Sequence, residues 1–157
     1  MISLHRLPAE DLRRLAGLRT APGQQNFVGD GASMILDPTP QVSFHEIRDG
    51  DGSAVGMFKL DPLYWTRHDF ATPADMGLRG FLIDAPLQGR GLGSAALAAL
   101  PGHVRALHPG FRSVVLTVNT ANPVAYRTYL RAGLEDRGEL YHGAPQGPEH
   151  VLWLALR

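Results

Sequence analysis

The sequence predicts a single α/β domain whose central mixed sheet of about six or seven strands is flanked by about four helices. The length of 157 residues corresponds to about one domain. Apolar residues make up 44% of the chain, which is enough for one packed core. Strand-like and helix-like patterns follow one another without an internal repeat or an interdomain linker. We therefore expect residues 1–157 to fold as one domain.

The N-terminal part of the chain predicts a strand, a helix, a loop and a hairpin. Residues 2–7 alternate between apolar and polar side chains, as a half-buried strand does. Residues 8–18 predict a helix, because their leucines recur near helical spacing. Residues 20–41 are rich in Gly, Pro and Gln and predict a loop with one short helical turn. Residues 41–61 form two alternating runs around Asp-Gly-Asp-Gly, which is a strong hairpin signal.

The middle of the chain predicts a loop, a strand, a helix and a buried strand. Residues 62–75 are polar and aromatic, and residues 76–84 form a strand that leads into a glycine-rich segment. Residues 94–107 have helix-forming composition with one apolar stripe. Pro101 is expected to kink this helix, because its ring removes a donor and clashes one turn back. Residues 112–119 read as a buried strand.

The last part of the chain predicts a capped helix and a closing pair of strands. Residues 121–133 form the helix, with Asn122 as its N-cap and Gly133 just past its end. Residues 135–143 and 149–157 form the strand pair, joined by a Gly/Pro-rich connection.

Composition excludes several classes of function. Lys and Arg number 15, as do Asp and Glu, so the zero net charge argues against a nucleic-acid-binding or membrane-surface protein. No run is long enough to span a membrane, and the N-terminus lacks a secretory apolar core. The absence of cysteine excludes disulfides and thiolate metal sites, and it agrees with a cytoplasmic location. The seven histidines show no metal-ligand spacing, so we expect no metal.

Three glycines at every second position mark the junction between a predicted strand and a predicted helix. At the start of a helix, backbone N–H groups lack intrahelical partners and carry partial positive charge. Gly89, Gly91 and Gly93 would let a ligand approach those groups closely. The pattern therefore suits a phosphate or pyrophosphate bound by the main chain, with Arg90 adding charge.

Three phosphate-binding signatures compete for this segment. A P-loop needs Gly-Lys-Ser/Thr, and no lysine occurs here. A dinucleotide fingerprint is a near match, but Ser94 stands for its third glycine and Asn119 for the acid that ends the next strand. The pattern Q-x-x-G-x-G is met by Gln88, Gly91 and Gly93. A tight strand–helix connection without any ligand remains open.

Two motifs in the correct order resemble the GNAT acetyltransferase superfamily. FLIDAPLQGRGLGSAAL, residues 81–97, is similar to the pyrophosphate-binding motif of that superfamily. Asn122, Ala125, Tyr129 and Gly133 resemble its second signature. The resemblance implies the GNAT-type fold, with a mostly antiparallel sheet, and transfer of acetyl from acetyl-CoA to an amine. More narrowly, QQNFVG, LRGFLID and GPEH resemble the spermine/spermidine acetyltransferase-like branch.

The resemblance also assigns roles to individual residues. The strand backbone of Phe81, Leu82 and Ile83 would bind the pantetheine arm, beside a slot where this strand splays from its neighbour. The residues that would hold the pyrophosphate are Gln88, Gly89, Arg90, Gly91, Leu92, Gly93 and Ser94. Asn122 would contact the cofactor from the next helix. Tyr129 would protonate the departing CoA thiolate, since the amine attacks directly in a ternary complex.

The sequence leaves the general base and the acceptor open. Glu46, Asp75 and Asp84 are candidate bases, but their spacing singles out none of them, and a water chain is an alternative. Asp61 and Asp69 lie with Asp75 in a loop that also holds aromatic residues. That loop suits a cationic acceptor such as a polyamine, but it reads equally well as ordinary surface. A small-molecule amine or a protein amine is the expected partner.

Other interpretations also remain. Tyr129 fits a core aromatic and Asn122 fits a helix cap, without any catalytic role. A sensor module that binds acyl-CoA without turnover is the alternative function, and a binder of NAD-type cofactors is a third. The C-terminal strands are a candidate surface for a homodimer, but symmetry is not written in one sequence.

Overall fold

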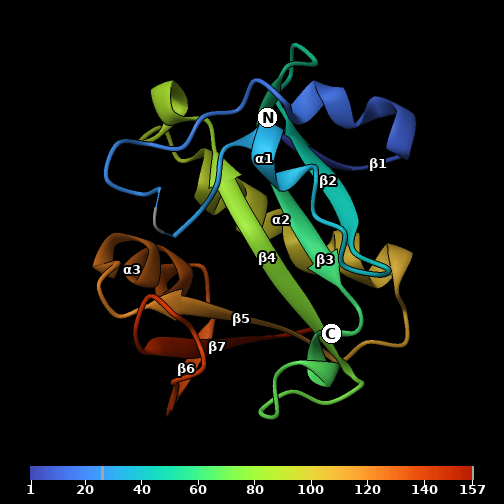
Figure 1. Ribbon diagram of the computed structural model, residues 1–157. Coiled ribbons are helices and arrows are strands. Elements are labelled where there is room, and N and C mark those ends of the chain that lie inside the picture. Colours follow the sequence, from blue (N-terminus) through green and yellow to red (C-terminus); the bar gives the residue numbers. More distant parts are fainter. Residues whose placement is uncertain (26, 157) are drawn as a thin grey trace.

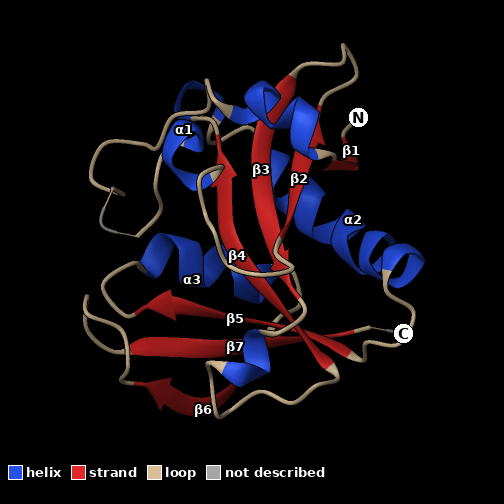
Figure 2. Cartoon of the chain, turned by 45° about the vertical axis from the view of Figure 1, so that its right-hand side comes forward, coloured by secondary structure: helices blue, strands red, loops and turns tan. Residues whose placement is uncertain are grey.

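The chain forms one seven-stranded sheet of strand order β1-β2-β3-β4-β5-β7-β6, as the cartoon in Figure 2 shows. The structure is a computed structural model that describes residues 1–25 and 27–156. The strands are β1 Ser3–Leu7, β2 Ser43–Arg48, β3 Ala54–Asp61, β4 Asp75–Ile83, β5 Ser113–Asn119, β6 Glu135–Tyr141 and β7 Glu149–Ala155. Within these residues β4 and β5 pair in parallel and the other neighbours pair antiparallel. The predicted mixed, mostly antiparallel sheet is confirmed.

Helices and short helical turns connect the strands. The α-helices are α1 Gly31–Met34, α2 Leu92–Leu107 and α3 Pro123–Arg131, and the 3-10 helices are η1 Ala9–Leu15, η2 Tyr64–Thr66 and η3 Ala85–Leu87. The helix predicted over residues 8–18 is present as the shorter 3-10 helix η1, Ala9–Leu15, and not as an α-helix. Its leucines at positions 12, 15 and 18 are three residues apart, which is the period of a 3-10 helix. Helix α2 starts two residues before the predicted 94 and continues through Pro101.

The two faces of the sheet carry different layers. On one face, which we call the α2 face, buried Met76, Leu78 and Leu116 pack with the apolar stripe of α2. On the other, which we call the Tyr64 face, Val115 and Val151 pack with Tyr64. In Figure 1 helix α2 passes behind the strands, whereas α1 lies in front of them. The sheet therefore separates α2 and α3 from the loop that carries Tyr64.

Strands β4 and β5 separate after a short parallel ladder. Their pairing covers only Asp75–Gly77 with Ser113–Val115. Beyond that ladder β4 and β5 diverge, and α3 lies beside the opening (Figure 1). The predicted splay between these strands is present, and it leaves the second half of β4 without a partner on its β5 side.

A β-bulge marks the point where β4 turns away. The register between β3 and β4 shifts by one residue, from Lys59 opposite Arg79 to Met57 opposite Leu82. Gly80 lies inside the shift with φ of 59°, a left-handed conformation that favours glycine. A bulge bends its strand and re-aims the backbone groups after it. Residues 81–83 therefore present their free edge to the opening.

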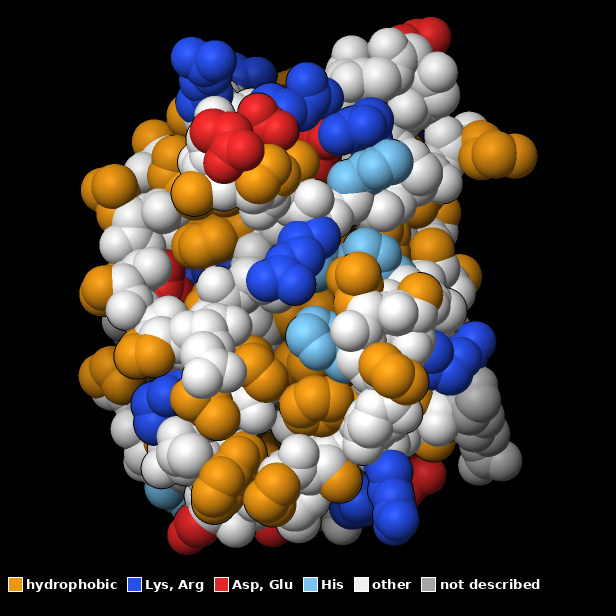
Figure 3. Space-filling view, turned by 90° about the vertical axis from the view of Figure 1, so that its right-hand side faces the viewer, with side chains coloured by type: hydrophobic (Ala, Val, Ile, Leu, Met, Phe, Trp, Pro, Cys, Tyr) orange, Lys and Arg blue, Asp and Glu red, His pale blue; other side chains and the backbone are white. Residues whose placement is uncertain are grey.

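The surface mixes charges of both signs. On the face turned to the viewer in Figure 3, basic and acidic side chains lie next to one another rather than in separate patches. This mixture agrees with the zero net charge of the sequence. Within the described residues, no helix combines the length and apolar character that a bilayer crossing requires.

Candidate active site

A cavity of about 1130 Å³ occupies the opening between β4 and β5. Leu116 and Val118 line it from the α2 face of β5, where they belong to the main core. Thr117 and Asn119 line it as well, and alternation along a strand places them on the Tyr64 face. The cavity therefore runs through the plane of the sheet and connects its two faces.

Nearly all residues predicted to bind the cofactor meet in this cavity. Those that line it are Phe81, Leu82, Ile83, Gln88, Gly89, Gly91, Leu92, Gly93, Ser94 and Asn122, and Tyr129, the predicted proton donor, lines it with them. Arg90 lies in the same turn but is exposed and does not line the cavity. We call the part formed by the segment 81–94 and helix α3 the cofactor end.

The glycine-rich turn exposes backbone donors at the start of α2. Gly91 is the N-cap of this 16-residue helix and has φ of 78°. The first bond of the helix runs from the Ala95 N–H to the Gly91 carbonyl, over 3.0 Å. The N–H groups of residues 92–94 come before that bond, and no side chain caps them. They form a cradle of partial positive charge that suits an anion.

Gln88 fastens the turn to the end of β4. Its side-chain amide donates to the carbonyl of Ile83 over 3.1 Å. This bond fixes the approach of the turn to the strand whose free edge borders the cavity. The side chain of Gln88 therefore has a structural role in addition to the cofactor contact predicted for it.

Helix α3 brings Asn122 and Tyr129 to the same cavity. The Asn122 side chain accepts a bond from the Ala125 N–H over 3.5 Å and so caps the helix, as predicted. The Tyr129 ring packs edge-on against Phe81, with 6.1 Å between the ring centroids. Burial raises the pKa of Tyr129 above that of an ordinary phenol. Tyr129 therefore keeps its proton at neutral pH and is able to donate it.

None of the three acids considered as a general base lines the cavity. Glu46 is fully buried and forms ion pairs with Arg14 at 2.7 Å and with Arg48 at 2.5 Å. Asp75 accepts bonds within the turn that precedes β4, and Asp84 accepts from the backbone of the N-terminal segment. Each carboxylate is engaged in holding the fold, so the candidates Glu46, Asp75 and Asp84 are not brought to the site.

The acids of the 61–75 loop do not form an acidic pocket either. Asp61 is fully buried and pairs with Arg67 and Arg79. Asp69 borders a separate small pocket of the surface. The acidic residues that were expected to bind a polyamine in this loop therefore do not line the cavity.

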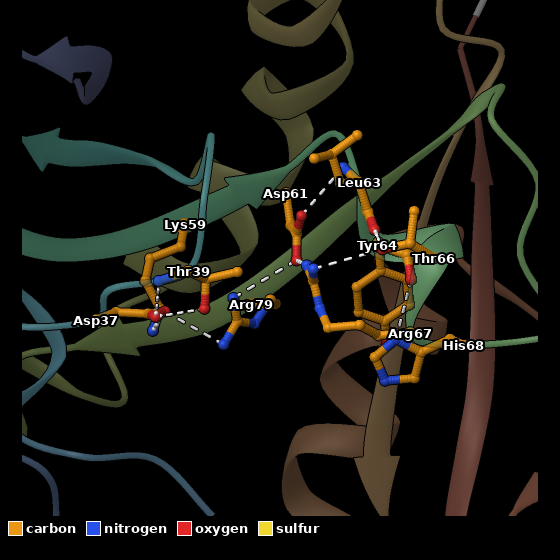
Figure 4. A network of polar contacts seen from close by, with 10 residues as sticks. All are labelled: Asp37, Thr39, Lys59, Asp61, Leu63, Tyr64, Thr66, Arg67, His68 and Arg79. Atoms are coloured by element: carbon orange, nitrogen blue, oxygen red, sulfur yellow. Dashed lines mark hydrogen bonds and ion pairs between the residues drawn. The ribbon is translucent and has the colours of Figure 1, made fainter.

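Asp61 is part of a chain of charges on the Tyr64 face, drawn in Figure 4. Arg79 reaches Asp37 at 3.2 Å and Asp61 at 3.5 Å, and Lys59 pairs with Asp37 at 2.8 Å. Burial opposes ionisation of Asp37, but its bonds with Lys59 and with a threonine hold its pKa well below the ordinary range. We call Asp37, Lys59, Asp61, Arg67 and Arg79 the charge network.

His68, which sequence reasoning did not single out, also lines the cavity. Its ring stacks on Tyr64 with 3.8 Å between the ring centroids. Its Nδ1 lies 3.2 Å from the Tyr64 carbonyl, which only accepts, so Nδ1 carries the hydrogen and Nε2 keeps its lone pair. Burial lowers the pKa of His68, which leaves the ring neutral and basic at neutral pH.

Glu149 is the second residue that sequence reasoning missed. Among the described residues that line the cavity, it is the only carboxylate. It pairs in register with Asn119 of β5 and with Tyr141 of β6. Burial raises the pKa of Tyr64, and the charge of Glu149 acts in the same direction. Glu149 therefore lies close enough to influence the Tyr64 hydroxyl, and only strand register could have revealed it.

Asn119 has a structural part at this end of the cavity. Its side-chain amide donates to the Gln146 carbonyl over 3.0 Å, and its oxygen accepts from the Ala121 N–H over 2.8 Å. Both ends of the amide are thus engaged. Asn119 therefore ties the connection between β6 and β7 to the end of β5.

The match to a family of proteins decides the class of the chain. The model of the acetyltransferase (GNAT) family matches residues 9–134. The chain belongs to the GNAT acetyltransferase family. Its membership of this family makes it an acetyl-CoA-dependent N-acetyltransferase. No protein of curated function matches the sequence.

Solved structures of GNAT acetyltransferases share the fold at low sequence identity. An aminoglycoside acetyltransferase AAC(6')-Ib in complex with coenzyme A has a TM-score of 0.77 and 19% identity, and the match covers 99% of this chain and 95% of that one. The spermidine/spermine N-acetyltransferase SpeG from Vibrio cholerae has a TM-score of 0.68 and 14% identity, with coverage of 99% and 95%. A ribosomal-protein alanine N-acetyltransferase from Escherichia coli has a TM-score of 0.69 and 16% identity, with coverage of 99% and 94%.

Proposed function

We propose that this GNAT enzyme transfers acetyl from acetyl-CoA to a primary amine by direct attack in a ternary complex, with residues 1–157 acting as one catalytic domain. One observation carries the proposal. With the exception of Arg90, the residues predicted to hold the cofactor line the same cavity as the phenol of Tyr129, and that cavity runs through the sheet. Two substrates are thus able to meet from opposite faces.

The cofactor end fits the diphosphate and the extended arm of CoA. The uncapped N–H groups of residues 92–94 supply donors to an anion without any titratable side chain. Residues 81–83 offer the free edge of a strand, whose backbone groups are able to pair with an extended amide-bearing arm. When bound, acetyl-CoA supplies the acetyl group as a thioester.

Tyr129 and His68 account for the two protons of the reaction. A new N–C bond forms and the C–S bond breaks, so the nitrogen loses a proton and the sulfur gains one. Tyr129 donates its phenolic proton to the departing sulfur, since its raised pKa keeps that proton in place. His68 accepts the amine proton at Nε2, which the bond of Nδ1 to the Tyr64 carbonyl leaves free.

The acceptor is a small-molecule amine or a protein amine. The support for a polyamine acceptor is the resemblance of three short sequence strings to the spermine/spermidine branch. One of these strings includes Asn26, which lies outside the described residues. The structural relatives named above are acetyltransferases of aminoglycosides, of spermidine and spermine, and of an alanine of a ribosomal protein. At 14–19% identity they share the fold and do not select one of these acceptors.

The test is release of free CoA thiol in the presence of a mixed pool of amines, with acetylated products identified by mass spectrometry. The enzyme is expected to release thiol only when an amine is present and to yield an N-acetylated product. Binding of CoA without any product from the pool would instead favour the acyl-CoA sensor.

A further inference from the structure

The charge network presents mainly guanidinium groups to the cavity. Arg67 and Arg79 both line it, with side chains 40% and 31% exposed. The carboxylates of Asp37 and Asp61 lie beneath them, 10% and 0% exposed. In Figure 4 the two arginines approach Asp61 from opposite sides. A ligand in the cavity would therefore contact the guanidinium groups rather than the carboxylates of the network.

The network also contains more cations than carboxylates. Lys59, Arg67 and Arg79 share the carboxylates of Asp37 and Asp61, which leaves one positive charge in excess. The Nη1 atom of Arg79 is buried and has no hydrogen-bond partner among the described residues. Guanidinium groups bind carboxylates through paired N–H bonds, so an anionic group on a ligand would relieve this excess.

A negative charge stands apart from this network in the same cavity. Glu149 forms no ion pair with any residue that the structure describes. Tyr64, Arg79 and Glu149 all line this cavity. Burial raises the pKa of Tyr64, and the charges of Glu149 and Arg79 act on it in opposite directions. The lining of the cavity thus holds guanidinium groups and a carboxylate together with the stacked rings of Tyr64 and His68.

From this arrangement we propose that the acceptor carries a carboxylate as well as the reacting amine, as an amino acid does, with Arg67 and Arg79 binding the carboxylate and Glu149 the ammonium group. The inference rests on the proposed function and adds the chemical class of the acceptor. Glu149 would hold the ammonium group near His68. His68 takes a proton from that group, and the resulting free amine attacks the thioester. A polyamine lacks the anionic group that the two arginines would bind.

Paired acceptors that differ only at the carboxylate test the proposal. Amino acids and their primary amides would be compared by release of CoA thiol, with the full-length enzyme and saturating acetyl-CoA. The expected result is kcat/KM at least about 10-fold higher for amino acids than for their amides, the size of one charge-assisted contact. Equal values for both members of each pair would overturn the proposal.

Variants of the two arginines and of Glu149 separate carboxylate binding from ammonium binding. Arg67→Gln and Arg79→Gln are each expected to raise KM about 10-fold for amino acids while leaving KM for the amides unchanged. Glu149→Gln is expected to raise KM for both. Arg67 is on a surface loop, so its variant keeps the test valid if Arg79→Gln fails to fold. Arg105→Gln and Glu139→Gln are matched controls, because both residues are exposed and neither lines the cavity.

The outcomes also distinguish this inference from the function it rests on. Acetylation of carboxylate-free amines with no gain from a carboxylate would refute the acceptor class and leave the N-acetyltransferase proposal standing. If the arginine variants lost kcat/KM equally for amino acids and for their amides, the acceptor class would likewise be refuted and the N-acetyltransferase proposal would stand. CoA binding with no acetylation of any amine would refute both.

Discussion

The two ends of the cavity are built from different parts of the chain. The cofactor end is mostly backbone, supplied by the contiguous segment 81–94 at the end of β4 and the start of α2. The other end, which we call the acceptor end because the proposed function places the amine there, is made of side chains from distant positions. His68, Arg79 and Glu149 come from a loop, β4 and β7. A backbone site leaves a glycine pattern in the sequence, whereas a side-chain site depends on how strands are placed beside one another.

The difference also predicts how each end responds to change. Main-chain donors do not titrate and are not removed by ordinary substitutions, so the cofactor end should be insensitive to pH and sensitive to added bulk. The acceptor end should respond to pH and to loss of charge. Tyr129, which α3 brings to the cofactor end, should affect turnover without affecting either binding step, because its proposed role is to donate a proton.

Tyr129→Phe is expected to have the largest effect. Loss of the phenolic proton should lower kcat by about 10²-fold, because the departing thiolate then leaves without an acid. The affinity for CoA, measured by calorimetry, should hardly change, since the ring still packs against Phe81. Unchanged turnover would remove Tyr129 from the mechanism, and weakened CoA binding would place it in the cofactor site instead.

His68→Gln is expected to lower kcat/KM by about 10- to 100-fold and to change its pH profile. Burial lowers the pKa of His68, so the neutral base persists down to acidic pH and the wild-type enzyme should lose activity only below about pH 6.5. The variant should lack this acidic limb. His142→Gln, an exposed histidine outside the cavity, is the control and should keep both rate and profile. Retention of the limb in His68→Gln would assign it to another group.

Gly93→Ala is expected to weaken CoA binding by about 10-fold, the smallest of the three effects. An added Cβ would meet Ile83 at 3.6 Å and Phe81 at 3.8 Å, which are ordinary contacts that the fold tolerates. The methyl group would, however, occupy the side of the helix start that lines the cavity. Gly102→Ala, on the same helix but exposed and outside the cavity, should stabilise the fold by about 0.5–1 kcal/mol without changing CoA affinity. Equal CoA affinity in both variants would contradict a backbone cradle.

Prediction from sequence succeeded where the pattern is local. Alternation, turn residues and the Asn122 cap define the strands and α3. The glycine motif indicates a segment that lines the cavity, and its binding of the cofactor stays a prediction. Prediction from sequence failed at η1, where leucine spacing of three indicates a 3-10 helix rather than an α-helix. It also offered Asp61 for a surface that binds a cationic acceptor, with ordinary surface as the equal alternative, because the sequence does not show that Arg67 and Arg79 neutralise this carboxylate.

The residues of the acceptor end could not be predicted from the sequence, for a physical reason. Glu149 enters the cavity only because β7 inserts between β5 and β6 and aligns it with Asn119, a register that no local motif encodes. His68 becomes a candidate base only once the structure shows its ring in the cavity, with Nδ1 facing the Tyr64 carbonyl. Long-range pairing, rather than composition, determines both positions.

The central claim is that the uncapped amides at the start of α2 bind the diphosphate of CoA. Two-dimensional amide NMR of the labelled 17.0 kDa protein, titrated with CoA, tests it most directly. The largest shifts are expected at residues 89–94, and pantetheine, which lacks the diphosphate, should leave those amides almost unmoved. Saturable CoA binding that shifts other amides but not these would contradict the claim.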